Sequence, residues 1–115
     1  MYDADYFIDK FEKIPDAQWT TGRYFHQQKA MNQYCAVGHC GGSDSSDTEE
    51  SAALKALFSG NVGSPVSVND GRITNNFSAR ERYILHVKCL TPKSRILQVL
   101  NWIKEDRPLN QEKYR

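Results

Sequence analysis

One short stretch of the chain, residues 32–42, gathers most of the residue types that could carry out covalent chemistry. It contains two of the three cysteines, one of the three histidines and three glycines. Asn32 is a residue type that caps helices, so the sequence predicts a helix with Cys35 in its first turn and His39 four residues later on the same side. A helix N-terminus and a nearby imidazolium both favour the thiolate, which makes Cys35 a candidate nucleophile.

Thiol chemistry would also need a base and a residue that orients it. His39 or His86 could act as the base, and Asn69 or Asp70 in a predicted turn could orient its imidazole ring. Packing is the alternative interpretation, because free cysteine is among the most buried residue types and behaves as a small hydrophobe. For Cys35 we favour packing over a nucleophilic role.

Metal binding is a second chemistry open to the same residue types. A structural zinc takes four nitrogen or sulfur ligands. The side chains that could supply them are Cys35, His39 and Cys40, with Cys89 or His86 as the fourth ligand. Because Cys-x₄-Cys is not a usual zinc-binding spacing, we expect neither a metal nor another cofactor. The odd number of cysteines indicates reduced thiols and not a secreted disulfide scaffold.

Charge is distributed unevenly along the chain, although the net charge is only +1. Residues 1–70 carry five Lys/Arg and ten Asp/Glu, whereas residues 71–115 carry ten and four. This asymmetry can form a basic surface for an acidic protein or a nucleic acid, or it can let the two halves attract each other. The candidate binding residues are Arg72, Lys93 and Arg95. The last two lie near the positive end of a predicted helix, where acids are usual.

The elements that would position these residues are mostly helices. Apolar residues in Asp3–Lys13 have helical spacing, while residues 23–31 could form a strand or a loop. Capping and acidic residues at 47–50 predict a helix over Glu49–Ser59. Gly60 is expected to end that helix in the left-handed conformation.

The C-terminal half contains further residue patterns that predict where helices and turns begin and end. Alternation over Val66–Val68 predicts a brief extended piece, followed by a turn at residues 69–71. A Ser-x-x-Glu capping box favours a helix over Arg80–Cys89, although alternation there also fits a strand. A Thr-Pro pair predicts a helix over Pro92–Glu105. Residues 109–115 are expected to form a polar tail.

These segments predict a mainly α fold, a compact single domain of about four helices with a short extended segment. A chain of 115 residues suffices for one modest core. We expect the domain to span residues 1–108. The expected core residues are large or apolar: Phe7, Phe11, Trp19, Cys35, Leu54, Leu57, Phe58, Ile96, Leu100 and Ile103.

Several short motifs are spread over nearly the whole chain: Trp19 and Gly22, Cys35 to His39, the helix from Glu49 to Phe58, Val68 to Gly71, and Thr91 to Leu97. Their order resembles a family of small uncharacterised domains of bacteria and their phages. Its members combine a Cys-Ala-Leu-Gly-type motif, an Asn-Asp turn and a Thr-Pro-capped C-terminal helix. Residues 72–90 are longer than the family pattern. The resemblance implies that the chain is one intact domain of phage or mobile-element source. It implies no particular reaction.

Composition and hydropathy restrict the functional classes. The apolar share of 39% suits a globular protein. The longest apolar runs fall far short of the roughly 20 residues that cross a bilayer, so we expect a cytoplasmic protein without membrane contact. Our first hypothesis is a non-enzymatic binding module, a phage accessory protein that contacts a host protein. The alternatives are a thiol-dependent hydrolase or transferase using Cys35, and nucleic-acid or nucleotide binding through the basic half, for which no reading module is present.

Overall fold

The computed structural model describes residues 1–27, 31–43 and 45–105 of the chain. Over these residues the fold is mainly α with one small sheet, which confirms the predicted fold class. The same residues form six α-helices instead of about four: α1 (Ala4–Glu12), α2 (Ala36–His39), α3 (Glu49–Ser59), α4 (Pro65–Asp70), α5 (Ala79–Tyr83) and α6 (Pro92–Lys104). The remaining elements are the 3₁₀ turn η1 (Asp16–Gln18), strands β1 (Phe25–Gln27) and β2 (Asn32–Tyr34), and the π-helical turn η2 (Ile84–Lys88).

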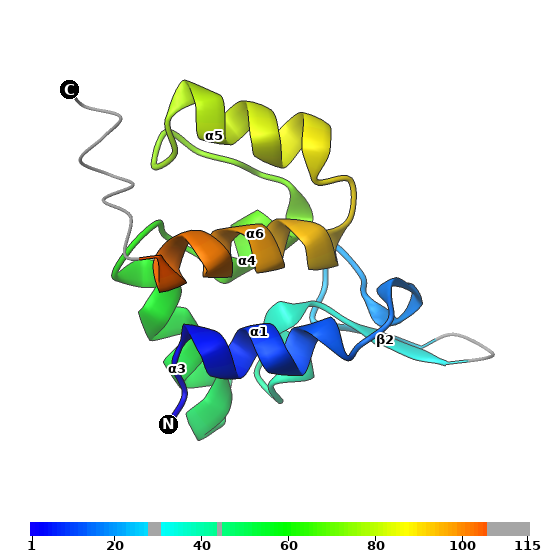
Figure 1. Ribbon diagram of the computed structural model, residues 1–115. Coiled ribbons are helices and arrows are strands. Elements are labelled where there is room, and N and C mark those ends of the chain that lie inside the picture. The colour runs from blue at the N-terminus through cyan, green and yellow to red at the C-terminus, as the bar shows by residue number, and fades with distance from the viewer. Residues whose placement is uncertain (28–30, 44, 106–115) are drawn as a thin grey trace.

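Helices α1 and α6 lie side by side and run antiparallel (Figure 1). Two contacts near opposite ends fix their register. Lys104 pairs with Asp5 at 2.8 Å, and Lys93 Nζ donates to the Glu12 carbonyl oxygen at 3.1 Å. The helix predicted over Asp3–Lys13 is confirmed as α1. Asp3 caps its N-terminus, where the side chain accepts a backbone N–H of the first turn.

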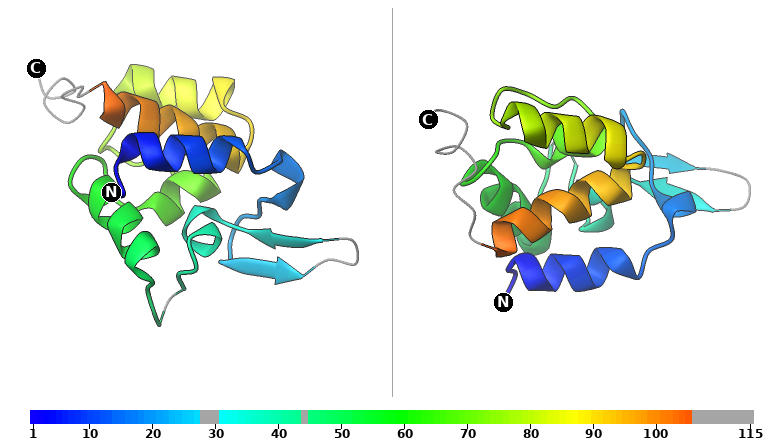
Figure 2. Two further views of the ribbon diagram at one scale, coloured as in Figure 1. Left: turned by 60° about the horizontal axis from the view of Figure 1, so that its bottom comes forward. Right: turned by 45° about the horizontal axis from the view of Figure 1, so that its top comes forward.

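Strands β1 and β2 form an antiparallel hairpin that projects from the helices (Figure 2). Phe25 is paired with Tyr34 and Gln27 with Asn32. The strand alternative for residues 23–31 is therefore confirmed at β1, while residues 28–30 of that segment lie outside the described residues.

The helix expected to begin at Asn32 is wrong. Asn32 is the first residue of β2, and the short helix α2 begins only after Cys35. Cys35 is the N-cap, since its Sγ accepts the N–H of Gly38 at 3.4 Å. Pairing with β1 satisfies the backbone before Cys35, which is a tertiary effect that residue-type preferences do not contain.

Helix α3 matches the predicted bounds, Glu49–Ser59, and its capping box is formed by Thr48 with Ser51. Gly60 is the C-cap, but its φ of −69° is right-handed, so the expected left-handed ending is wrong. The extended piece expected at Val66–Val68 is also wrong, because these residues belong to α4.

Helix α4 has the same start signal as α6. Ser64 accepts the N–H of Val66, and Pro65 occupies the first helical position, where no N–H is needed. Gly71, at φ +80°, ends the helix in the left-handed conformation that glycine adopts most readily. The predicted turn after Val68 is thus the end of α4.

The capping box before α5 is formed by Ser78 and Glu81, as predicted. Residues 79–88 are helical, with a π-helical second half, so the helix is confirmed and the strand alternative is wrong. Thr91 and Pro92 start α6 as predicted, and α6 ends at Lys104. The predicted tail, residues 109–115, lies outside the described residues.

The core gathers between α1, α3, α4 and α6, and the short α2 packs against α3, α4 and α6. Eight of the ten expected core residues are buried, while Leu57 and Ile103 are half-buried at its edge. Cys35, Ala36 and Val37 are all buried, which places α2 at the centre of the packing. No helix among the described residues is both long enough and apolar enough to span a membrane.

Candidate functional site

Cys35 lies in the core and not at an accessible site. Its exposed fraction is 1%, and the hydrogen bond of its Sγ comes from the backbone N–H of Gly38. Burial raises the pKa of the Cys35 thiol above its ordinary value. A nucleophilic cysteine requires the opposite shift together with access for a substrate.

His39 is not placed to act as the base for the Cys35 thiol. Its Nε2 donates to the main-chain carbonyl of Gln18 at 3.0 Å, because a carbonyl oxygen can only accept. The ring packs beside Trp19 and Tyr34, with centroid distances of 4.8 and 5.2 Å. Burial lowers the pKa of His39 to about 4, so the imidazole is neutral at pH 7. The hydrogen bonds of the described residues include none between this ring and the Cys35 thiol.

The other candidate ligands and bases do not assemble around Cys35 either. Cys40 and Cys89 are buried and unpaired, and burial raises the pKa of Cys40 to about 12. His86 is exposed on the separate helix formed by α5 and η2. Within residues 1–27, 31–43 and 45–105, no group of three or more His, Cys, Asp or Glu is arranged to hold a metal ion.

Asn69 connects three segments through its side chain, which is fully buried. Its Oδ1 accepts the N–H of Ala36 at 3.0 Å, and its Nδ2 donates to the Thr20 carbonyl oxygen and to Asp70 Oδ1, both at 2.9 Å. The partners of Asn69 are therefore two backbone groups and a carboxylate. They fix α2, α4 and the segment after η1 relative to one another.

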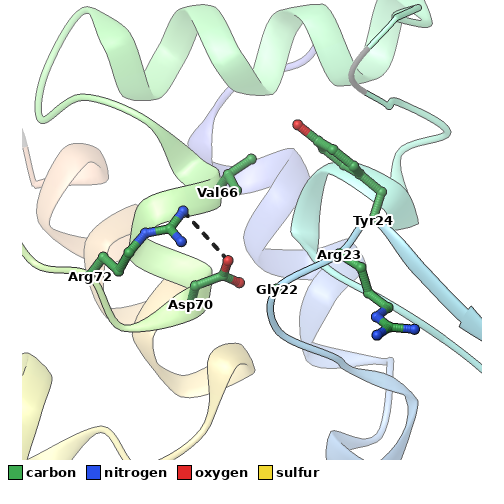
Figure 3. Close-up of a pocket in the computed structure, with 6 residues that line it drawn as sticks. All are labelled: Gly22, Arg23, Tyr24, Val66, Asp70 and Arg72. Carbon is green, nitrogen blue, oxygen red and sulfur yellow. Dashed lines mark ion pairs between the residues drawn. The ribbon is translucent and has the colours of Figure 1, made fainter.

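Asp70 lies at a pocket of about 320 Å³ between α4 and residues 22–24. Its side chain is only 7% exposed, and its Oδ2 lies 3.7 Å from Arg72 NH2. Figure 3 shows Asp70 and Arg72 together on one side of the pocket, with Tyr24 and Arg23 on the other. Of the residues predicted from the sequence, the structure brings together Asp70 and Arg72 at this pocket, with Asn69 behind them.

The two other predicted binding residues have contacts within the fold. Arg95 donates from Nε to the Val68 carbonyl oxygen at 3.1 Å and from NH2 to that of Asn69 at 2.8 Å. The Asn69 carbonyl is one that the end of α4 leaves without a helical partner, whereas the Val68 carbonyl also accepts the N–H of Gly71 at 3.1 Å. Lys93 satisfies the last carbonyl of α1 in the same way. Arg72 differs, since its side chain is 67% exposed.

A second surface was not anticipated from the sequence. Along α5, η2 and the C-cap that follows them, the buried residues Glu81, Leu85 and Cys89 have a four-residue spacing. Tyr83 and Val87 lie two residues out of step and therefore point to solvent. We call the exposed side chains of this segment the outer surface: Arg80, Tyr83, His86, Val87, Lys88 and Leu90. Once the helix is assigned, the spacing of Tyr83 and Val87 is the signal that could have identified it.

Comparison with known proteins adds no assignment to this geometry. No protein-family model matches the chain, and no similar protein is found among curated proteins or solved structures.

Proposed function

We propose that the protein is a non-enzymatic binding module whose outer surface contacts a protein partner of acidic and apolar character. The observation that carries the proposal is the exposure of three apolar side chains. Tyr83 is 54% exposed, Val87 48% and Leu90 77%. A helix at the surface of a globular protein normally turns polar residues outward, so apolar side chains on the outer side favour a contact with another molecule.

The charges around these side chains favour an acidic partner. Arg80, His86 and Lys88 are exposed beside them. Glu81 is the one acid in the sequence from residue 80 to residue 90. It is 2% exposed, and its carboxylate accepts the N–H of Ser78 at 2.7 Å. The outer surface is therefore basic and apolar, and an acidic amphipathic helix is its natural complement.

These basic groups have no acidic partner within the described fold. The ion pairs of the described residues include neither Arg80 nor Lys88. Their positive charge is therefore available to a partner. The family resemblance makes a host protein contacted by a phage protein the first partner class to search.

A selection from a displayed library of helical peptides tests this proposal. Enriched peptides should be acidic, with an apolar stripe. The dissociation constant of the best peptide should rise at least about tenfold in the triple variant Tyr83→Ser, Val87→Ser, Leu90→Ser, because apolar anchors carry most of the energy of such contacts. Anionic lipid vesicles should not bind more tightly than the peptide.

A matched triple variant controls for the loss of exposed apolar area. Tyr2, Phe25 and Met31 are 40%, 46% and 37% exposed and lie outside the outer surface. Changing these three to serine should leave peptide affinity within about twofold. Equal losses in the two triple variants, or enrichment of peptides without acidic residues, would overturn the proposal.

A further inference from the structure

We propose that the pocket at Asp70 and Arg72 binds a free α-amino acid, with the ligand's ammonium group on Asp70 and its carboxylate on Arg72. This site is independent of the outer surface. Six residues line it: Gly22, Arg23, Tyr24, Val66, Asp70 and Arg72. The volume of about 320 Å³ lies at the lower end of the range of about 300–1,000 Å³ for small-molecule sites.

Asp70 presents a carboxylate to the pocket. Its carboxylate is 7% exposed, and Oδ1 accepts a hydrogen bond from Asn69 Nδ2 at 2.9 Å. Oδ2 faces Arg72 NH2 at 3.7 Å, an ion-pair distance that is too long for a direct hydrogen bond. A ligand ammonium in the pocket would donate to Oδ2 directly, and such charge-assisted hydrogen bonds are among the strongest in proteins.

The Asp70 carboxylate is also held in place before any ligand arrives. Asn69, its hydrogen-bond donor, is itself fixed by the backbone groups of Ala36 and Thr20. Binding would therefore need little rearrangement on this side of the pocket, which favours affinity for a small ligand.

Arg72 is suited to the other end of an amino acid. Its guanidinium offers parallel donors that match a carboxylate, and its side chain is 67% exposed and can adjust. Arg23 also lines the pocket, but its NH1 contacts His26 Nδ1 at 2.9 Å and its guanidinium points away from Asp70 in Figure 3.

The charges of the pocket exclude the simpler ligands. A purely cationic ligand would meet the positive charge of Arg72 and Arg23, and a purely anionic ligand would meet the buried carboxylate of Asp70. A zwitterion satisfies both signs at once. Val66 and Tyr24 provide an apolar wall and an aromatic wall for its side chain.

Calorimetric titration of the purified protein with each of the twenty protein amino acids at millimolar concentration tests the inference. At least one should bind saturably. Its decarboxylated amine and its deaminated acid should each bind at least about tenfold more weakly, because each loses one charge-assisted contact. The substitutions Asp70→Asn and Arg72→Gln should each weaken binding of the amino acid by a similar factor.

Arg80→Gln is the matched control, since Arg80 is exposed and lies outside the pocket, and it should leave amino-acid affinity unchanged. Circular dichroism reports whether Asp70→Asn still folds. Arg72→Gln alters an exposed side chain, so its result counts even if the Asp70 variant unfolds. Absence of saturable binding by every amino acid, equal binding by the deaminated acid, or unchanged affinity in Arg72→Gln would overturn the inference.

Discussion

Asn69 is the residue on which most of the central geometry depends. Its side chain joins the N-terminus of α2, the end of α4 and the segment after η1, and it orients Asp70 at the pocket. The sequence identified Asn69 as a turn former and a possible partner of an imidazole. Its buried role depends on Thr20 and Ala36, which lie 49 and 33 positions away and which local patterns cannot reveal.

Replacing Asn69 with alanine should lower the free energy of unfolding by about 2–4 kcal/mol. The change leaves the N–H of Ala36 and the carbonyl of Thr20 without their partner in a buried setting. Urea denaturation followed by circular dichroism measures the loss. Asn101→Ala, at an exposed position of α6, should change stability by less than about 0.5 kcal/mol. Similar effects of the two substitutions would contradict the role given to Asn69.

His39 should make the protein less stable in acid. Above its ordinary pKa of 6.5 the ring is neutral in both states, so its contribution is fully present. As the pH falls from 6.5 towards the folded value of about 4, only the unfolded chain takes up the proton and stability is lost. Because the ring is partly exposed, we expect a loss of about 1–2 kcal/mol.

The check is denaturant unfolding at pH 7 and pH 4 of wild type and His39→Gln. The variant should lose less stability than wild type between these two values. His86→Gln, which removes an imidazole from the outer surface, serves as the control. If His39→Gln and wild type lose the same stability on acidification, burial of a neutral His39 is not the cause.

The three cysteines should react slowly with alkylating reagents in the folded protein. Cys35, Cys40 and Cys89 are 1%, 3% and 6% exposed, and burial raises the pKa of each thiol. At pH 8 we expect alkylation at least about a hundredfold slower than in denaturant, since reaction requires opening of the structure. Mass spectrometry after digestion gives the rate at each site. Rapid reaction of Cys35 below pH 7 would restore the thiol-chemistry hypothesis.

At the scale of elements, the sequence predicted helices wherever their start signals are local. Capping residues within a few positions of one another identify α3, α5 and α6, and α1 follows from apolar spacing. The predictions were wrong where residues outside the local pattern determine the secondary structure. Asn32 pairs across the hairpin, and Val66–Val68 become helical after Ser64 and Pro65, a start signal that the alternation obscured.

Gly38 shows how closely α2 approaches the first strand. A Cβ added to Gly38 would lie 2.1 Å from the Tyr24 carbonyl oxygen, which already accepts the N–H of Cys35. Gly38→Ala should therefore cost about 2–3 kcal/mol of stability. Gly22→Ala should cost about 1 kcal/mol, because Gly22 has a φ of +76° but open space around it. Thermal and urea unfolding compare the two, and a Gly38→Ala variant as stable as wild type would contradict this packing.

At the scale of the whole molecule, the charge asymmetry of the sequence is only partly used inside the fold. Lys104–Asp5 and Arg72–Asp70 are the ion pairs among the described residues that join the acidic and basic halves. Counting residues in the sequence shows that the C-terminal half carries the excess positive charge. It could not show which basic residues the fold uses, since Arg95 and Lys93 bind backbone carbonyls.

The outer surface and the pocket are two separate places where this molecule could meet a partner. The outer surface combines basic and apolar side chains on α5 and η2, while the pocket combines Asp70 and Arg72 beside α4. Because the two share no residue, variants of one serve as controls for the other.

The most direct test of the proposed function is to map the contact of the best selected acidic peptide by amide chemical shifts in ¹⁵N-labelled protein. We expect the largest shifts within residues 80–90 and an affinity that falls steeply with added salt, because exposed charges are screened. Shifts concentrated elsewhere, with residues 80–90 unchanged at saturation, would contradict it.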